Sequence, residues 1–218
     1  MSHLLLVPTE PELRRLRPRL RSHVGDEHVT GRWTIALCGF GQVAAAARTA
    51  LLIAKHRPQQ VLLVGIAGAL RDDVTIGAAY TFDRVLCDGI GVGSDADYLA
   101  AAEIGWKQWA SDDPGGAIGD EIELACSTPV GDLAGATLLS VCAASAQRQL
   151  RYPEAVAEEM EGFGVAMACK LAGVPLRIVR GISNRAGNRN LAEWQIEESL
   201  AAAAELASEL IAAEEAPK

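Results

Sequence analysis

The sequence predicts an α/β fold, a three-layer α/β/α sandwich around a mixed, mostly parallel central sheet. Half of the 218 residues are hydrophobic and only 5% are aromatic, which is typical of an aliphatic, well-packed core. Uninterrupted aliphatic runs of strand length, such as residues 61–64, alternate with segments of helical spacing, as expected for strands covered on both faces. The chain has no internal repeat and no linker, so residues 1–218 are expected to form a single domain.

The N-terminal half alternates strands and helices. The first strand is expected at the apolar run 4–8, and a helix follows at 10–20, which Pro18 would kink or end. A second strand at 33–37 closes on a glycine-rich turn, and the alanine-rich segment 42–56 forms the next helix.

The C-terminal half is expected to continue this alternation. Its elements are strands within 77–92, a loop at 111–121, a strand at 138–141, a helix at 155–172, a strand at 174–182, a loop at 183–190 and a helix at 194–213. Gly173 is placed to cap the end of the helix before it, because glycine readily adopts the left-handed conformation found there.

Charge and cysteine content narrow the class of protein. A formal net charge of −8 argues against nucleic acid as a partner, because a duplex-binding domain normally carries a basic excess. The five cysteines are odd in number and contain no C-x-x-C pair, which indicates free thiols in a reducing compartment. Neither a secretion signal nor a membrane-spanning run is present, so the sequence indicates a cytoplasmic protein without a membrane partner.

The distribution of histidines and serines limits the possible chemistry. No histidine pairs with another histidine or a cysteine at metal-ligand spacing, so neither a metal nor another cofactor is expected. The sequence also lacks a G-x-S-x-G nucleophile elbow. Catalysis is therefore expected to depend on carboxylates and amides.

Two glycine-rich segments follow successive predicted strands. The first, with Gly39 and Gly41, resembles a dinucleotide fingerprint, but the required acid at the end of the next strand is missing. Such a turn into a helix still offers backbone N–H groups to an anion or a polar ligand. The second segment is interpreted as a turn at the end of the strand 61–64, and two such turns favour a pocket at this edge of the sheet. It consists of Gly65, Ile66, Ala67, Gly68 and Ala69.

An acidic cluster, Glu158, Glu159 and Glu161, surrounds Met160. Most glutamates are solvated surface groups, but Glu161 precedes an uncharged segment that must be buried. A carboxylate at the start of a buried helix needs a partner, and sugar hydroxyls are suitable donors.

Four short motifs in order resemble the nucleoside phosphorylase/nucleosidase family, and the resemblance covers nearly the whole chain. They are the two glycine-rich segments, the E-M-E-G segment 159–162 and the R-G-I-S-N segment 180–184. The resemblance implies a nucleoside phosphorylase-like fold, a nucleoside substrate and a homodimer or higher homo-oligomer.

The same resemblance assigns roles to individual residues. Glu12 corresponds to the acid that activates water, Glu161 to the carboxylate that binds the ribose 2′ and 3′ hydroxyls, and Met160 to the residue packed against the sugar. Arg180 and Ser183 correspond to supporting positions near the water and the base. Glu159 corresponds to an acid at the start of the helix.

Within the family, residues 65–69 and 182–185, with Arg189 and Trp194 downstream, resemble the branch that hydrolyses futalosine to hypoxanthine and dehypoxanthine futalosine. Asn184 favours this branch, whose leaving base hypoxanthine is a 6-oxopurine, over methylthioadenosine/adenosylhomocysteine nucleosidases. Those enzymes have an aspartate at this position to protonate adenine N7. Residues 61–69 contain no basic side chain for a phosphate clamp, which favours hydrolysis over a purine nucleoside phosphorylase. A nucleoside-binding protein without catalytic activity is the alternative from another class, and the presence of both Glu12 and Glu161 argues against it.

Overall fold

The computed structural model describes residues 2–25, 32–111, 116–125, 136–144 and 151–215. Its helices are α1 (Glu10–Leu20), α2 (Gln42–His56), α3 (Gly162–Ala172) and α4 (Ile196–Glu215), with 3-10 turns at Asp95–Asp97, Ala102–Ile104 and Leu191–Glu193. Its strands are β1 (His3–Val7), β2 (Val24–Gly25), β3 (Trp33–Leu37), β4 (Val61–Ala69), β5 (Ala79–Thr81), β6 (Arg84–Asp88), β7 (Gly91–Val92), β8 (Leu99–Ala100), β9 (Glu121–Glu123), β10 (Thr137–Val141), β11 (Ala155–Glu159) and β12 (Leu176–Arg185).

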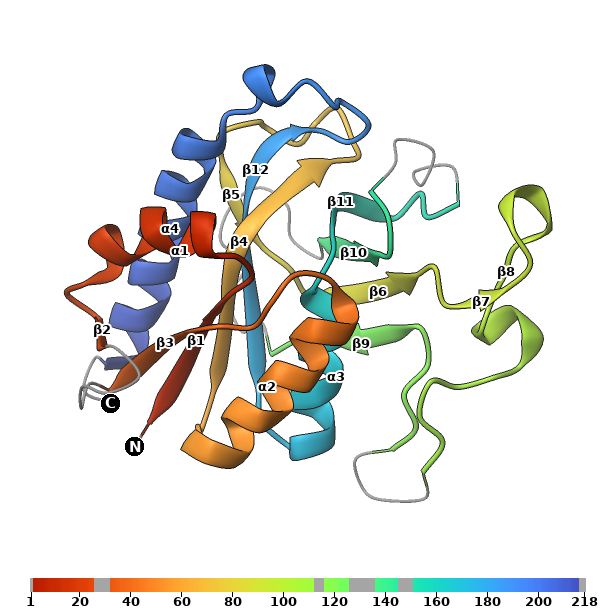
Figure 1. Ribbon diagram of the computed structural model, residues 1–218, viewed down its shortest axis with the longest axis horizontal. Helices are drawn as coiled ribbons and strands as arrows, with labels where there is room; N and C mark the ends of the chain where they lie inside the picture. The colour runs from red at the N-terminus through yellow and green to blue at the C-terminus, as the bar shows by residue number, and fades with distance from the viewer. Residues whose placement is uncertain (1, 26–31, 112–115, 126–135, 145–150, 216–218) are drawn as a thin grey trace.

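The central sheet is mixed and mostly parallel, which confirms the predicted fold class. Its order is β2-β3-β1-β4-β11-β10-β6-β9, and β12 lies on the other edge of β4 beside β5. The pairs β1–β3, β1–β4, β4–β12, β10–β11 and β6–β10 are parallel, whereas β4–β11, β5–β12 and β6–β9 are antiparallel. β7 and β8 form a separate hairpin that projects from the body of the molecule (Figure 1).

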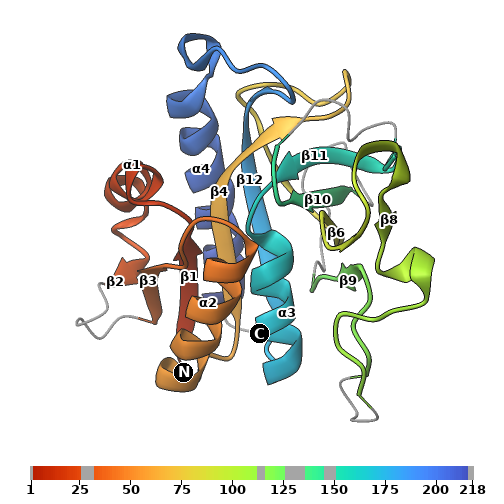
Figure 2. The ribbon, with the colours of Figure 1, turned by 45° about the vertical axis from the view of Figure 1, so that its right-hand side comes forward.

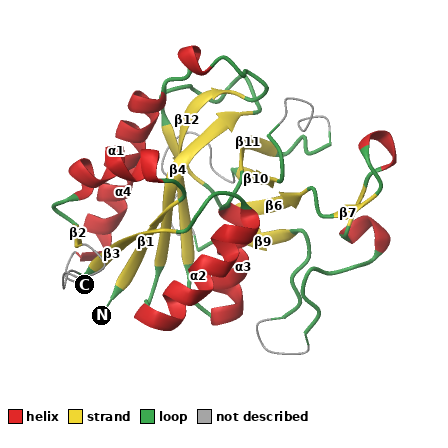
Figure 3. Ribbon diagram, in the orientation of Figure 1, coloured by secondary structure: helices red, strands yellow, loops and turns green. Residues whose placement is uncertain are grey.

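Helices cover both faces of the sheet, which gives the three layers (Figure 3). α2 and α3 pack on one face and α1 and α4 on the other, each pair with its own apolar cluster. The strands are apolar on both faces for this reason: in β4, Leu63 belongs to the α2–α3 cluster, whereas Leu62 and Val64 belong to the α1–α4 cluster. None of the described helices is long and apolar enough to cross a membrane.

The helix predicted at 155–172 is wrong in its first part. Residues 155–159 form the strand β11, and α3 begins only at Gly162, with Glu161 as its N-cap residue. All five residues of β11 are buried, including Glu158 and Glu159. A short buried run carries no periodicity that separates strand from helix, so the sequence pattern could not place this boundary. The predicted C-cap is confirmed, since Gly173 has a φ of 67°.

The sequence predicts several other elements in the correct region, but the structure gives them different ends. The segment 65–69 is not a turn, because β4 continues through it to Ala69 while paired with β12. Likewise β12 extends through Arg185, so Ser183 and Asn184 lie in the strand and not in a loop. Pro18 lies inside α1, which continues to Leu20. The predicted loop 111–121 ends where β9 begins, and its residues 112–115 lie outside the described residues.

Candidate active site

The candidate site lies where β4 changes its partner along one edge. β1 pairs with β4 up to Leu63, and β11 pairs with it in the opposite direction at Gly68 and Ala69. Between these two ladders no described strand pairs with this edge of β4. A cavity of about 340 Å³ lies there, bordered by the β1–α1 connection, β4, the β11–α3 connection, the end of β12 and the start of α4. Figure 2 shows α1 and β10 on opposite sides of β4.

Glu12 enters this cavity from the first turn of α1. It is 7% exposed and stands three residues after the N-cap residue Thr9. Its Oε2 accepts hydrogen bonds from the Thr9 backbone N–H at 3.1 Å and from the Thr9 hydroxyl at 2.5 Å, the reach-back contact of a capping box. Its Oε1 accepts the Ile66 N–H of β4 at 3.0 Å. The carboxylate is therefore held by both the helix and the strand, on the part of β4 that β1 and β11 leave open.

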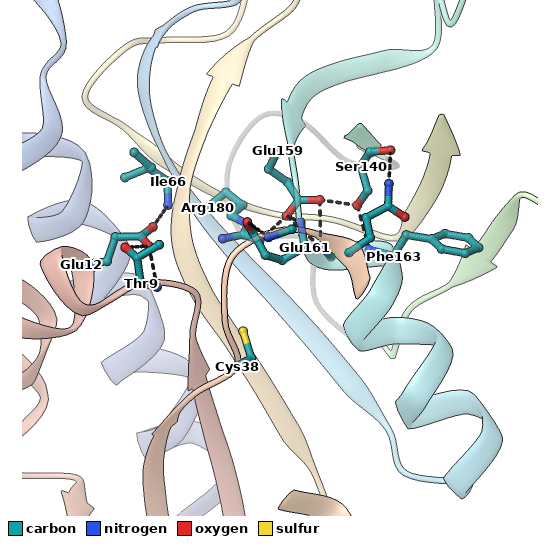
Figure 4. A network of polar contacts seen from close by, with 12 residues as sticks. Thr9, Glu12, Cys38, Ile66, Ser140, Glu159, Glu161, Phe163 and Arg180 are labelled. Atoms are coloured by element: carbon teal, nitrogen blue, oxygen red, sulfur yellow. Dashed lines mark hydrogen bonds and ion pairs between the residues drawn. The ribbon is translucent and has the colours of Figure 1, made fainter. Parts of the chain in front are cut away.

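Glu159 is a buried anchor at the end of β11. Its carboxylate accepts the backbone N–H groups of Glu161 at 2.9 Å and Gly162 at 2.8 and 2.9 Å. It also accepts a hydrogen bond from the Ser140 hydroxyl of β10 and pairs with the Arg180 guanidinium of β12. Figure 4 shows this network joining three strands and the start of α3. So many donors leave Glu159 little capacity to react, and its contacts fix the positions of Glu161, Gly162 and Arg180.

Glu161 is held less firmly, and its charge is disfavoured. Its Oε1 accepts the Gly41 N–H at 3.1 Å, and its Oε2 lies 3.4 Å from Arg180 Nη2. Burial, and next the charge of Glu159, raise the pKa of Glu161 to about 7, against the opposing effects of Arg180 and the Gly41 N–H. A carboxylate with so few donors can accept further hydrogen bonds from a ligand.

Arg180 reaches the acids by crossing Gly65. It is fully buried, and β12 places it directly opposite Gly65 of β4. A Cβ atom at residue 65 would collide with Arg180 Nη1 and lie 2.8 Å from Glu12 Oε1. Glycine at this position therefore permits the guanidinium to reach Glu159 and Glu161 from the other edge of β4.

The turn before α2 supplies the backbone donor to Glu161. Gly39 and Gly41 have φ angles of 93° and 83°, a region that favours glycine. The sequence predicts an N–H at this turn for an anion, and in the structure Glu161 itself occupies the Gly41 N–H. Cys38 lies beneath the turn, where burial raises the pKa of its thiol to about 12, so it is not a nucleophile near neutral pH.

Ser183 and Asn184 form the polar end of the cavity. The Ser183 hydroxyl donates to Asn184 Oδ1 at 2.8 Å, and Asn184 Nδ2 donates to the Arg185 carbonyl at 2.7 Å. These contacts fix the amide plane and leave the second N–H of Nδ2 for another acceptor. Gly68 lies beside them, since a Cβ there would be 3.5 Å from Asn184 Nδ2.

The structure brings most of the predicted site residues to one cavity. Those that line it are Glu12, Ile66, Ala67, Gly68, Glu159, Met160, Glu161, Ser183 and Asn184. The other four, Gly39, Gly41, Gly65 and Arg180, lie behind this lining and act through the residues that they contact.

Sequence reasoning missed part of the site. Ser140 gives no motif signal, because it is a single serine in an apolar strand, yet it donates to Glu159 and accepts the Phe163 N–H at 2.7 Å. Phe40 also lines the cavity, together with Arg189 and Trp194, which resemble the futalosine-hydrolysing branch of the family. Ala144, in the segment after β10, also lines the cavity, while residues 145–147 lie outside the described residues. The described part of the chain holds no cluster of three or more His, Cys, Asp or Glu side chains that could bind a metal ion.

The fold and this carboxylate-lined cavity belong to a known class of proteins. The phosphorylase superfamily model matches residues 5–101 and 126–213, so the chain is a member of that superfamily.

Individual relatives narrow the comparison. A futalosine hydrolase of Streptomyces coelicolor is 31% identical and aligns over 78% of this chain and 74% of its own length. A futalosine hydrolase of Thermus thermophilus is 30% identical over 97% of this chain and 96% of its own length.

Solved structures share the fold at lower sequence identity. A futalosine hydrolase of Helicobacter pylori superimposes with a TM-score of 0.74 at 21% identity, covering 98% of both chains. A mutant of the Helicobacter pylori 5′-methylthioadenosine nucleosidase, with 5′-methylthioadenosine in its active site, has the same TM-score and identity over 97% of this chain and 98% of its own.

Proposed function

We propose that the protein is a nucleosidase that hydrolyses the N-glycosidic bond of futalosine, releasing hypoxanthine and dehypoxanthine futalosine. The observation that carries this proposal is the meeting of Glu12, Glu161 and Asn184 in one cavity. Each comes from a different part of the sequence, and each has a place in glycosidic cleavage. The similarity to curated futalosine hydrolases over most of the chain supports the choice of substrate.

Glu161 and Met160 form the sugar site in this proposal. Glu161 has few internal donors, so the ribose 2′ and 3′ hydroxyls can donate to it. As the C1′–N9 bond lengthens, positive charge develops on the ribose ring, and the buried carboxylate stabilises it. Met160 packs partly buried beside this position and contacts the sugar.

Glu12 is the group that activates water. It lies at the cavity wall with one oxygen on the Ile66 N–H and the other on Thr9, so its position is fixed before substrate binds. The water oxygen bonds to C1′ as the bond to N9 breaks, and Glu12 accepts the water proton. Arg180 supports this arrangement from behind Gly65, where its Nη1 and Glu12 Oε1 both border the space that a Cβ at residue 65 would fill.

The leaving base is a 6-oxopurine because of Asn184. An amide cannot supply a proton to N7, but its free N–H can donate to N7 or O6 of the purine. Ser183 holds the amide oxygen at 2.8 Å, which directs that N–H. Hydrolysis is favoured over phosphorolysis because β4 contributes no basic residue to the cavity wall.

The decisive experiment incubates the purified protein with futalosine and quantifies hypoxanthine. We expect hypoxanthine release that is independent of added phosphate. A rate that depends on phosphate, with a sugar-1-phosphate product, would assign a phosphorylase instead. Faster cleavage of 5′-methylthioadenosine than of futalosine would assign the related nucleosidase, and no base release from any nucleoside would leave a binding protein.

We also propose that the chain acts as a homodimer or higher homo-oligomer in the cytoplasm. Several large apolar side chains are exposed, among them Phe40, Val43 and Trp106 at 65%, 86% and 66%. Phe40 also lines the cavity, so an interface over Phe40 would adjoin the site. Cys38, Cys87, Cys142 and Cys169 are free thiols, which supports a reducing compartment. Light scattering at several protein concentrations tests the assembly.

A further inference from the structure

The positive charges around the cavity are unequally compensated. Two arginines line it, Arg15 and Arg189. Arg15 is paired with the Glu197 carboxylate and donates to the Pro11 carbonyl at 2.9 Å. Arg189 donates only to a carbonyl, that of Ala144, and no carboxylate pairs with it among the described residues. Residues 145–150, which follow Ala144 in the sequence, contain no acid.

Arg189 lies at the same end of the cavity as Asn184. It stands five residues after Asn184, in the connection that follows β12, and its bond to Ala144 joins this connection to the segment after β10. Ala186, which packs in one apolar cluster with Ala144 and Met160, is the neighbour of Gly68 beside Asn184. Glu12 enters from α1, and Figure 1 shows α1 and β10 on opposite sides of β4. Arg189 therefore lies on the side of the cavity that holds Asn184, away from Glu12.

The leaving group needs positive charge at this end. In hydrolysis the electron pair of the C1′–N9 bond departs with the purine, and Asn184 cannot neutralise it with a proton. The four acids that line the cavity, Glu12, Glu158, Glu159 and Glu161, disfavour a purine anion beside them. Arg180 is already shared between Glu159 and Glu161.

From this geometry we infer that Arg189 binds the departing 6-oxopurine and stabilises the negative charge that develops on it. The bond from water oxygen to C1′ forms, the C1′–N9 bond breaks, and Glu12 takes the water proton. The purine leaves as an anion against the Arg189 guanidinium and receives its proton from solvent afterwards. This inference rests on the proposed function and adds to it the group that compensates for the missing acid at residue 184.

The test compares two leaving groups. Inosine carries a 6-oxopurine, whereas the p-nitrophenolate of p-nitrophenyl β-D-ribofuranoside is a stable anion that needs little help to depart. For Arg189→Met we expect kcat to fall about 100-fold on inosine and on futalosine, but less than about 3-fold on the p-nitrophenyl riboside. Arg189→Lys, which keeps the charge but loses the planar fork, should lie between wild type and Arg189→Met.

The control is Arg14→Met. Arg14 is an exposed arginine of α1 outside the cavity, and its removal changes the net charge equally. It should leave the ratio of the two rates unchanged. Equal losses on both leaving groups for Arg189→Met would assign Arg189 a structural role. A loss confined to the KM for futalosine, with inosine unaffected, would place Arg189 against the substituent on the ribose and not against the base. Either result overturns the inference.

A binding measurement separates this inference from the proposed function. Calorimetry with hypoxanthine, at pH values where the base is neutral and where it is deprotonated, needs no catalysis. Arg189→Met should weaken binding of the anion about 10-fold more than binding of the neutral base. If nucleosides are cleaved but this difference is missing, Arg189 is misassigned and the proposed function stands. If no nucleoside is cleaved but the difference is present, Arg189 binds the purine anion and the proposed hydrolysis is wrong. A protein that neither cleaves nucleosides nor binds hypoxanthine overturns both.

Discussion

At the scale of a single side chain, Asn184 sets the choice of base in the proposed function. Its Nδ2 lies 2.7 Å from the Arg185 carbonyl, so an aspartate oxygen in that place would face a carbonyl oxygen. That contact favours the protonated acid, which could then donate to N7 of adenine. We expect Asn184→Asp to raise the rate of 5′-methylthioadenosine cleavage relative to futalosine cleavage by about 10-fold or more. Parallel kcat/KM measurements on both substrates check this, and an unchanged ratio would show that residue 184 does not select the base.

In the proposed function, Glu161 sets the lower pH limit of activity. It must be ionised to stabilise the ribosyl cation, and burial beside Glu159 raises its pKa to about 7. We therefore expect kcat/KM to fall as the pH drops through about 7, and Glu161→Gln to lose about 100-fold at pH 8. A profile of kcat/KM from pH 5 to 9 measures this fall. Glu10→Gln is the control, because Glu10 is an exposed acid of α1 paired with Arg14 and its loss should leave the pH dependence unchanged. An inflection near the ordinary glutamate value would contradict the effect of burial.

At the scale of elements, the close approach of β12 to β4 depends on Gly65. In Gly65→Ala the new methyl group would meet Arg180 Nη1 and lie 2.8 Å from Glu12 Oε1. Arg180 is buried and held by Glu159, so it cannot move aside freely. We expect a loss of roughly 3 kcal/mol in the free energy of unfolding and a large loss of activity.

Urea unfolding of Gly65→Ala and Gly119→Ala compares a crowded glycine with an open one. A Cβ at Gly119 meets nothing within 4 Å, so this variant should stay within about 0.5 kcal/mol of wild type. If Gly65→Ala is equally stable and active, Arg180 does not cross the sheet as described.

The elements that could be predicted from sequence are those with clear periodicity or clear boundaries. α1 and α2 begin and end at the predicted residues, because their amphipathic pattern is bounded by Thr9 and the Gly41 turn. The strand and the helix within 155–172 could not be told apart from sequence. Ala155–Glu159 is buried throughout, so its sequence lacks the alternation of apolar and polar residues that marks a half-buried strand. The glycines of β4 suggested a turn, although they serve the close approach of Arg180 and Asn184.

At the scale of the whole molecule, the raised pKa of Glu161 couples stability to pH. The folded state keeps its proton up to about pH 7, whereas the unfolded chain releases it near pH 4.5. The folded protein therefore binds more protons between these values, and this contribution to stability is fully present below about pH 4.5 and is lost as the pH rises through about 7.

Urea unfolding between pH 4.5 and 8 measures this linkage. We expect the free energy of unfolding to decrease over this window by an amount on the order of 3 kcal/mol from Glu161, and Glu161→Gln to remove that part of the slope. The same slope in wild type and variant would mean that another group is responsible.

The assembly of the site could be predicted only as a list of residues. Glu12, Glu161 and Asn184 stand far apart in the sequence, and a family resemblance assigned their roles without placing them together. Their meeting depends on the change of partners along β4. Pairing of β4 with β1 ends at Leu63 of β4, and its antiparallel pairing with β11 begins at Gly68. Strand pairing over such separations has no local signal. The expectation of a single domain for residues 1–218 stays a prediction.

The open edge of β4 also has a consequence for spectroscopy. The Ile66 N–H is bound by the Glu12 side chain, and the Gly41 N–H by Glu161. The amide proton shift of Gly41 should therefore follow the ionisation of Glu161, and that of Ile66 should depend on the contact with Glu12. Two resonances in a nitrogen-15 spectrum would then report separately on the water end and the sugar end of the cavity, before any substrate is added.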